Sequence, residues 1–368
     1  MKIGLVCPYN LFKGGGVQEC VFAMQRELSK RGHQVVILTP QARSSAEVLP
    51  SYVRVLGTAT DMKSPFHTTA QVSVSLDMRQ LDELLQTEQF DLLHFHEPWV
   101  PLLARQILGR SDARNVATFH AKLPDTVMSK TIEKVITPYT RSVLKHLDSL
   151  TAVSDAAAEY VRGLTDRNVQ IIPNGIEVQR FRTLQAKPTQ TILFIGRLEK
   201  RKGVKYLLQA YAEIHQKLPQ TQLVIAGDGP DKQKLKELRD ELGLKKVRFT
   251  GFVSEDEKMR LLGQAGVFCS PAEYGESFGI VLLEAMAAGV PIVAGDNPGY
   301  ASVMQGRGTL SLVDPRDTAN FARRLELLLT DRTLRRAMLD WADTYVEQFD
   351  YPTVVDKYEQ LYERVLKI

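Results

Sequence analysis

Short apolar runs alternate with longer amphipathic stretches along the whole chain. The runs are four to six residues long and bounded by polar turns, a pattern typical of strands buried on both faces of a parallel sheet. Strand and helix alternation of this kind predicts an α/β fold. In the first half we expect strands at 3–7, 34–39, 92–95, 115–119 and 149–153, with helices at 17–31 and 131–147.

The same alternation begins again in the second half. We expect two doubly wound, Rossmann-like domains, residues 1–168 and 169–350, joined near residues 166–190, where the turn-rich Ile171–Gly175 lies. A pair of such domains would hold a ligand in the crevice outside the carboxyl ends of the strands. The second domain should contain strands at 191–195, 222–226, 247–250, 267–270 and 291–294, and helices at 203–217 and 278–288.

Composition excludes several classes of protein. The chain has 47 Lys and Arg against 43 Asp and Glu, evenly spread, whereas a dedicated nucleic-acid binder usually concentrates its basic residues. Cys7, Cys20 and Cys269 have no pairing spacing, so we expect neither a disulfide framework nor a metal site. The apolar N-terminal run is too short for a signal peptide or a membrane span. We therefore expect a cytoplasmic protein, with a peripheral position at the inner membrane face left open.

Two loops carry features of anion binding. Lys13–Val17 holds three consecutive glycines between the first strand and a helix, where the backbone can approach an anion closely. It is neither a full dinucleotide fingerprint nor a Walker loop, and a tight turn is the alternative. Gly196–Gly203 places four cations within six residues directly after a strand. Arginine can fork phosphate oxygens, although a solvated basic turn would explain the run equally well.

The segment Gly275–Pro291 is the most informative. Ser277 can cap a helix. Glu276 and Glu284 would then lie ~12 Å apart along it, too far for a glycosidase acid/base pair. The spacing suits two hydroxyl-bearing rings on either side of a diphosphate, with the N–H groups of 278–280 facing the phosphates. The alternative is one solvated and one capping glutamate.

Histidines follow two strand ends in the first half. His120 could be structural or functional, and His94–Pro98 has no standard zinc spacing, so we interpret it as a structural turn lining the cleft. The sequence contains no Asp-x-Asp, so we expect no cofactor and no obligatory metal. Arg197, Lys202 and helix termini would then meet the charge of a leaving diphosphate.

Together these motifs resemble the retaining GT-B glycosyltransferases of family four, and more narrowly the phosphatidylinositol mannosyltransferases of actinobacteria. The resemblance implies two Rossmann-like domains with an interdomain cleft and a C-terminal helix, residues 351–368, that crosses back to the N-terminal domain. The motifs occur in family order, at residues 15–17, 94–98, 117–120, 172–175, 196–203, 227–230, 251–253 and 275–289.

The resemblance also implies roles for individual residues. His120, Arg197, Lys202 and Glu276 would form the catalytic set, and Tyr9 and Lys122 would contact the acceptor. In the implied front-face mechanism the departing phosphate oxygen helps to deprotonate the acceptor hydroxyl. The donor nucleotide sugar would be bound by Gly15, Gly16, Arg197, Lys202, Glu255, Lys258, Glu276, Ser277, Phe278, Gly279, Ile280 and Glu284.

Donor and acceptor remain open at this stage. Glu255 could accept from the N–H edge of guanine, which favours GDP-mannose over a UDP-linked glucose or N-acetylglucosamine. The acceptor could be lipid-linked, a polyol or a saccharide. The mannosyltransferases carry a basic amphipathic helix for anionic membrane, but Val74–Phe90 has Arg79 as its single cation. Eight cations in Arg105–Lys145 could face an anionic membrane surface or form an ordinary helix exterior.

Three rival functions stay in view. A non-hydrolysing nucleotide-sugar epimerase shares the architecture and would need no acceptor. An NAD-dependent dehydrogenase would need the missing dinucleotide fingerprint. A non-catalytic nucleotide-sugar binder would bind the donor without turnover.

Overall fold

The computed structural model of the chain describes residues 1–12, 15–42, 49–63, 69–74, 77–100, 102–122, 127–184 and 189–367. The chain forms two compact units. The N-terminal unit comprises Met1–Gly175 together with Tyr351–Ile368, and the C-terminal unit comprises Ile176–Asp350.

An eight-stranded sheet forms the centre of the N-terminal unit, in the order β4-β3-β2-β1-β5-β6-β7-β8. All neighbouring strands are parallel except β3 and β4, which pair antiparallel at the edge. The central strands are short and almost entirely buried, as strands covered by helices on both faces of a sheet must be. The strands are β1 (Lys2–Val6), β2 (Gln34–Ala42), β3 (Val53–Lys63), β4 (Thr69–Val74), β5 (Leu92–His96), β6 (Arg114–Phe119), β7 (Ser149–Ala152) and β8 (Val169–Ile171).

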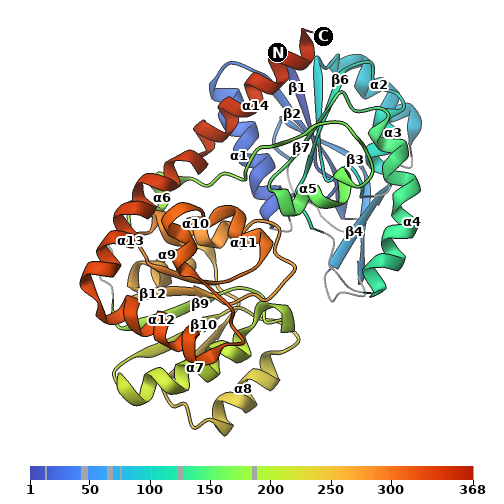
Figure 1. Cartoon of the computed structure of the whole chain (residues 1–368). Coiled ribbons are helices and arrows are strands. Elements are labelled where there is room, and N and C mark those ends of the chain that lie inside the picture. Colours follow the sequence, from blue (N-terminus) through green and yellow to red (C-terminus); the bar gives the residue numbers. More distant parts are fainter. Residues whose placement is uncertain are drawn as a thin grey trace. The chain divides into compact units, whose positions relative to one another are not determined.

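Six helices accompany this sheet among the residues that the structure describes. The C-terminal helix α14, red in Figure 1, lies beside α1, in blue, and both contribute to one apolar core. Arg31 at the end of α1 forms an ion pair with Asp356 of α14 at 2.6 Å. The helices are α1 (Gly16–Lys30), α2 (Met78–Glu88), α3 (Leu103–Leu108), α4 (Val127–Leu144), α5 (Asp155–Arg162) and α14 (Tyr351–Leu366).

The C-terminal unit contains a six-stranded, all-parallel sheet in the order β11-β10-β9-β12-β13-β14. Its strands are β9 (Thr191–Ile195), β10 (Gln222–Ala226), β11 (Val247–Gly251), β12 (Val267–Ser270), β13 (Ile292–Gly295) and β14 (Leu312–Val313). Strands β9 and β12 are neighbours in the sheet. After β9 the chain crosses to β10 on one side of this pair, and after β12 it crosses to β13 on the other side. Such a switch point is where doubly wound sheets bind ligands.

Helices α6 to α13 and three short 3₁₀ turns complete the C-terminal unit. Among the described residues, no helix combines the length and apolar character needed to cross a bilayer. The elements are α6 (Val178–Arg182), η1 (Lys200–Lys202), α7 (Val204–Lys217), α8 (Lys232–Glu241), α9 (Glu255–Gln264), α10 (Ile280–Ala287), α11 (Pro298–Val303), η2 (Gly306–Ser311), α12 (Thr318–Thr330), α13 (Arg332–Tyr345) and η3 (Val346–Phe349).

The expected organisation needs three corrections. The boundary expected between residues 168 and 169 lies at Gly175, because β8 pairs with β7 in the first sheet. The pattern did not predict β3, β4, β8 and β14, which are short, polar or mixed in character. The helix expected at 278–288 starts later, at Ile280, because Gly279 adopts a φ of +114° that an α-helix cannot contain.

Candidate active site

Two loops meet at the switch point of the C-terminal sheet, one after β9 and one after β12. Gly203, with φ +67°, approaches so closely that a Cβ there would lie 2.0 Å from the carbonyl oxygen of Pro271. The N–H of Glu273 donates to the carbonyl of Arg201 at 2.8 Å. Because backbone packs directly on backbone, the side chains of both loops are brought to one place.

Five charged residues of these loops form one continuous chain of ion pairs, which we call the Glu276 network. Glu276 Oε1 accepts from Arg201 Nη1 at 2.6 Å and from Lys202 Nζ at 2.8 Å. Buried Glu199 pairs with Arg201 at 2.9 Å through one oxygen and with Arg197 at 2.7 Å through the other. Three cations and two carboxylates leave the network with one net positive charge, which suits an anionic ligand.

Burial and the two carboxylates shift the pKa of Arg201, at the centre of this network, in opposite directions. Burial lowers the pKa of Arg201, but Glu276 and Glu199 more than compensate, so that the pKa is raised overall. The side chain of Arg197 is 46% exposed, whereas that of Lys202 is 15% exposed. Arg197 is therefore the cation of the pair most open to a ligand from solution.

The start of α10 differs from the sequence-based expectation. Ser277 is not its N-cap: Gly279 holds that position, and among the described residues no side chain caps the helix. Phe278 is buried against Phe349, with ring centroids 6.0 Å apart. The N–H of Leu282 donates to the Gly279 carbonyl at 2.9 Å, so the N–H groups of Ile280 and Val281 are the ones that can face an anion at this helix start. Because Glu276 precedes the helix, the helical spacing used to place it ~12 Å from Glu284 does not apply.

A second group of charges surrounds Glu284. This buried glutamate accepts from Lys258 Nζ at 2.7 Å, and Lys258 also pairs with Glu255 at 3.0 Å. Burial lowers the pKa of Lys258, but Glu284 and Glu255 raise it overall. Arg180 of α6 extends the group to Glu255 at 3.6 Å. The structure thus brings together the three residues expected near the base and ribose.

The glycines and acceptor residues expected in the first half lie in the N-terminal unit. Gly15 and Gly16 open α1 after β1, whereas Lys13 and Gly14 lie outside the described residues. The carbonyl of Tyr9 accepts from Thr39 Oγ1 at 2.8 Å, which fixes the loop after β1.

Part of the basic stretch from Arg105 to Lys145 is paired with carboxylates. Lys122, whose side chain is mostly buried, pairs through its ammonium group with Glu159 of α5 at 2.9 Å. Arg114 pairs with Asp148 at 3.1 Å, and Arg110 pairs with Asp82 at the same distance. Arg110, Arg114 and Lys122 lie outside the helices, and their pairing favours ordinary ion pairs within the unit over a membrane-facing basic patch.

Three buried histidines in the N-terminal unit, His94, His96 and His120, form what we call the histidine network. His120 Nδ1 lies 3.2 Å from Asn174 Oδ1, and its Nε2 lies 2.9 Å from His96 Nδ1. A carbonyl oxygen can only accept, so His120 donates to Asn174 and accepts from His96. His94 is hydrogen-bonded to Tyr362 of α14 at 2.7 Å. Both ring nitrogens of His120 are therefore bonded within its own unit.

Burial keeps these imidazoles uncharged. It lowers the pKa of His94 to about 3 and that of His120 to about 4, and it takes the pKa of His96 well below its usual range. Buried Glu97 accepts from the backbone N–H groups of His120 and Ala121. Burial raises the Glu97 pKa to about 7, although those N–H groups oppose the shift. His120 is thus a neutral, oriented ring near pH 7.

One group among the described residues has the composition of a metal site. Cys20, His96 and His120 offer ligand atoms within 4.8 Å of one another. The sequence-based expectation named no metal ligands. Here the facing nitrogens of the two histidines are hydrogen-bonded to each other, which describes an oriented imidazole pair. The three cysteines are unpaired and buried.

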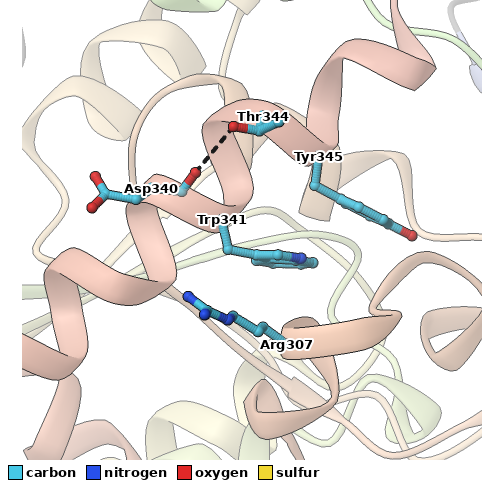
Figure 2. A pocket seen from close by; sticks show the side chains of 5 residues that line it. All are labelled: Arg307, Asp340, Trp341, Thr344 and Tyr345. Carbon is cyan, nitrogen blue, oxygen red and sulfur yellow. Dashed lines mark hydrogen bonds between the residues drawn. The ribbon is translucent and has the colours of Figure 1, made fainter.

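A surface hollow of about 290 Å³ lies elsewhere on the C-terminal unit, and Figure 2 shows its lining. Trp341 and Tyr345 of α13 stack with ring centroids 4.8 Å apart, and Gly308 packs against the indole edge. Arg307 of η2 lies across from them. None of these side chains belongs to the Glu276 network, so this hollow is separate from the candidate site.

Sequence reasoning left two members of the Glu276 network without a role. Arg201 was one of four cations in its loop, and Glu199 stood among them as a lone acid. A signal was present, because an acid inside a basic run that follows a buried strand indicates internal pairing. It could not show that Arg201 reaches Glu276, 75 residues along the chain.

Each half of the chain matches a known protein family. Residues 14–180 match the family described as Glycosyltransferase Family 4, and residues 175–342 match Glycosyl transferases group 1. The phosphatidyl-myo-inositol mannosyltransferase of Mycobacterium tuberculosis is 33% identical over 99% of this chain and 97% of its own length.

Solved structures share the fold at low identity. Sucrose-phosphate synthase from Thermosynechococcus elongatus superposes with a TM-score of 0.75 at 19% identity, covering 100% of this chain and 99% of that one. The Anabaena protein HepE, in complex with UDP, gives a TM-score of 0.77 at 18% identity over 99% and 100%. Both are similar to this chain in architecture.

Proposed function

This chain belongs to the family-four glycosyltransferases of group 1, and we propose that it transfers mannose from GDP-mannose to an inositol-bearing acceptor with retention of configuration. The Glu276 network, at the sheet switch point beside the open start of α10, is the observation that carries the proposal. The relative named a phosphatidyl-myo-inositol mannosyltransferase supports the choice of sugar and acceptor.

The proposed donor fits the charges of the C-terminal unit. Its diphosphate would bind Arg197, Lys202 and the first N–H groups of α10, since helix N-termini and guanidinium groups bind phosphates well. Glu276 would accept from the sugar hydroxyls and Glu284 from the ribose. Glu255 would accept from the N–H edge of guanine.

Negative charge develops on the diphosphate as the sugar leaves, so cations held ready at that position stabilise the transition state. The departing phosphate oxygen would take the proton of the acceptor hydroxyl. Support comes from His120, whose two ring nitrogens already bind Asn174 and His96 and whose low pKa leaves it a poor base. The cations of the Glu276 network would do the work of a metal ion, so we propose that none is required.

A UDP-sugar is the second candidate donor, because HepE, solved with UDP, shares the fold. A thermal-shift screen of GDP-mannose, UDP-glucose, UDP-N-acetylglucosamine and ADP-glucose separates the two, since a ligand of the native state raises its stability. Transfer is then assayed with phosphatidylinositol in mixed micelles and with free inositol, each with and without EDTA. NMR of the product reports the anomeric configuration.

The proposal predicts stabilisation by GDP-mannose above the other donors, and an α-mannosyl product that forms in EDTA. Stabilisation by a UDP-sugar alone would overturn the donor. Formation of the C2 epimer without acceptor would favour an epimerase. Donor binding without turnover on either inositol acceptor would contradict the proposed reaction.

A further inference from the structure

Arg201 lies between two carboxylates and binds both at once. Its Nη1 donates to Glu276 Oε1 at 2.6 Å and its Nε donates to Glu199 Oε2 at 2.9 Å. The side chains of Glu199 and Glu276 are 7% and 12% exposed. Because these pairs are largely shielded from water, their geometry is held far more firmly than that of surface ion pairs.

The same arginine also fixes the backbone that carries Glu276. Its Nη1 donates to the carbonyl of Gly275 at 3.1 Å, and its own carbonyl accepts from the N–H of Glu273. Gly275 has φ +74°, a left-handed turn that orients the next residue. On the far side, Gly299 packs so tightly that a Cβ there would lie 2.1 Å from the Glu276 carbonyl oxygen. Glu276 is thus held from both sides.

Two cations share one oxygen of Glu276, and they differ in what else they can do. Arg201 is a rigid planar fork already engaged by Glu199, whereas Lys202 carries a compact ammonium whose three donors can serve two anions at once. Of the two cations that contact Glu276, Lys202 is the one that can turn toward a phosphate without giving up a pairing with Glu199.

We propose that Arg201 is the positioning residue of the donor site. It holds the Glu276 carboxylate aimed at the sugar hydroxyls, so that Lys202 is available to the diphosphate, and Glu199 anchors the guanidinium of Arg201. This inference rests on the proposed function. It assigns Arg201 to recognition of the sugar half of the donor and not of the nucleotide half.

The test compares two ligands that differ only by the sugar. Calorimetric titration of the full chain with GDP and with GDP-mannose is paired with measurement of kcat and KM. For Arg201→Gln we expect a GDP Kd within about threefold of wild type, together with a loss of ~10²-fold in GDP-mannose affinity or kcat, the scale expected when a reacting group is displaced by about 1 Å. Glu199→Gln should give a smaller loss in the same direction.

Two variants guard against trivial explanations. Arg201→Lys keeps the charge and the fold but cannot fork two carboxylates, so it should recover only part of the loss. Arg260→Gln removes an exposed arginine that binds Glu257 on α9, and it should change the affinity for neither GDP nor GDP-mannose. Thermal unfolding of each variant identifies one that fails to fold.

If Arg201→Gln weakened the binding of GDP and of GDP-mannose equally, Arg201 would be a phosphate ligand and the inference would be overturned. Unchanged GDP-mannose binding and turnover would overturn it as well. If wild type binds GDP and then selects another sugar nucleotide, that donor replaces GDP-mannose in the same comparison. Failure of wild type to bind any nucleoside diphosphate would instead sink the proposed function, and with it this inference.

Discussion

The two units bury polar groups in opposite ways. In the N-terminal unit the histidine network is almost fully buried and uncharged, and each imidazole is oriented by neutral neighbours. In the C-terminal unit the Glu276 network is charged throughout and partly open to water. Both lie toward the carboxyl ends of parallel strands, the first at β5 and β6 and the second at β9 and β12.

The difference follows from the cost of burying charge. An isolated ion in the interior is energetically expensive, so a buried imidazole gives up its proton, whereas groups of opposite charge can be buried together as ion pairs. A neutral network fixes the shape of its surroundings, whereas a charged network selects ligands by the sign of their charge. We therefore expect acid to damage the first network, and charge-removing substitutions to damage the function of the second.

The largest expected effect is acid unfolding of the N-terminal unit. The pKa values of its histidines are depressed in the native state. The unit therefore keeps its full unfolding free energy above pH 6.5 and loses part of it as the pH falls toward about 4. Glu97 has the opposite effect: because its pKa is raised in the native state, acidification stabilises the native state relative to the unfolded chain. Three histidines outweigh one glutamate, giving a net loss of about 3 kcal/mol per pH unit below pH 6.5.

Urea unfolding at pH 7, 6 and 5 measures this slope. His94→Gln should flatten it, while His146→Gln, at an exposed position, should leave it unchanged. An unfolding free energy that stays constant from pH 7 to pH 5 would show that the histidines are not buried as neutral groups.

Removal of one phosphate-facing cation comes next. Lys202→Ala should lower kcat/KM by ~10³, because a preorganised charge at the leaving group is lost. Arg201 still neutralises Glu276, so the unfolding free energy should change by less than about 1 kcal/mol. Its neighbour Lys200, which is exposed, provides the matched control Lys200→Ala. Steady-state kinetics with equal losses in both variants would remove the special role of Lys202.

A stability effect without a charge change is expected at Thr118. Its hydroxyl contacts His94 at 2.6 Å, Thr151 at 2.6 Å and Tyr358 at 3.2 Å, all in the interior. Thr118→Val preserves shape but removes all three of these buried contacts, including the partner of His94 Nε2, which should cost about 3 kcal/mol. Thr330→Val, at an exposed helix end, should cost less than about 0.5 kcal/mol. Equal urea midpoints for the two variants would contradict the account of the network.

The smallest expected difference concerns two glycines with the same backbone conformation. Gly203 and Gly243 have φ values of +67° and +65°, but only Gly203 faces the backbone of Pro271; nothing lies within 4 Å of a Cβ at Gly243 among the described residues. Gly243→Ala should cost about 1 kcal/mol, and Gly203→Ala about 2 kcal/mol more, with a higher donor KM. Equal costs would show that the two loops are not packed as described.

The sequence predicted elements well where burial is complete. Strands β9, β10 and β12 have the bounds expected from their apolar runs. The antiparallel pair β3 and β4 was missed, because its residues are mixed and an edge strand needs no continuous apolar run. The family resemblance and the fold are confirmed by the comparisons.

Site geometry was harder to predict, since it depends on contacts across the sheet. The Gly279 conformation shifted the helix start away from Ser277, which composition alone could not reveal. The pairing of His96 with His120 follows from β5 and β6 lying side by side, with His96 opposite Thr118. That register could have been anticipated once the strands were assigned. The roles of the expected site residues stay predictions until a donor is bound.

A crystal structure of the full chain with GDP and magnesium-free buffer tests the central claim most directly. We predict the β-phosphate within hydrogen-bonding distance of Lys202 Nζ and of the first N–H groups of α10, with the guanidinium of Arg197 turned toward it. A diphosphate bound elsewhere, or one that leaves Lys202 and the start of α10 untouched, would contradict the account.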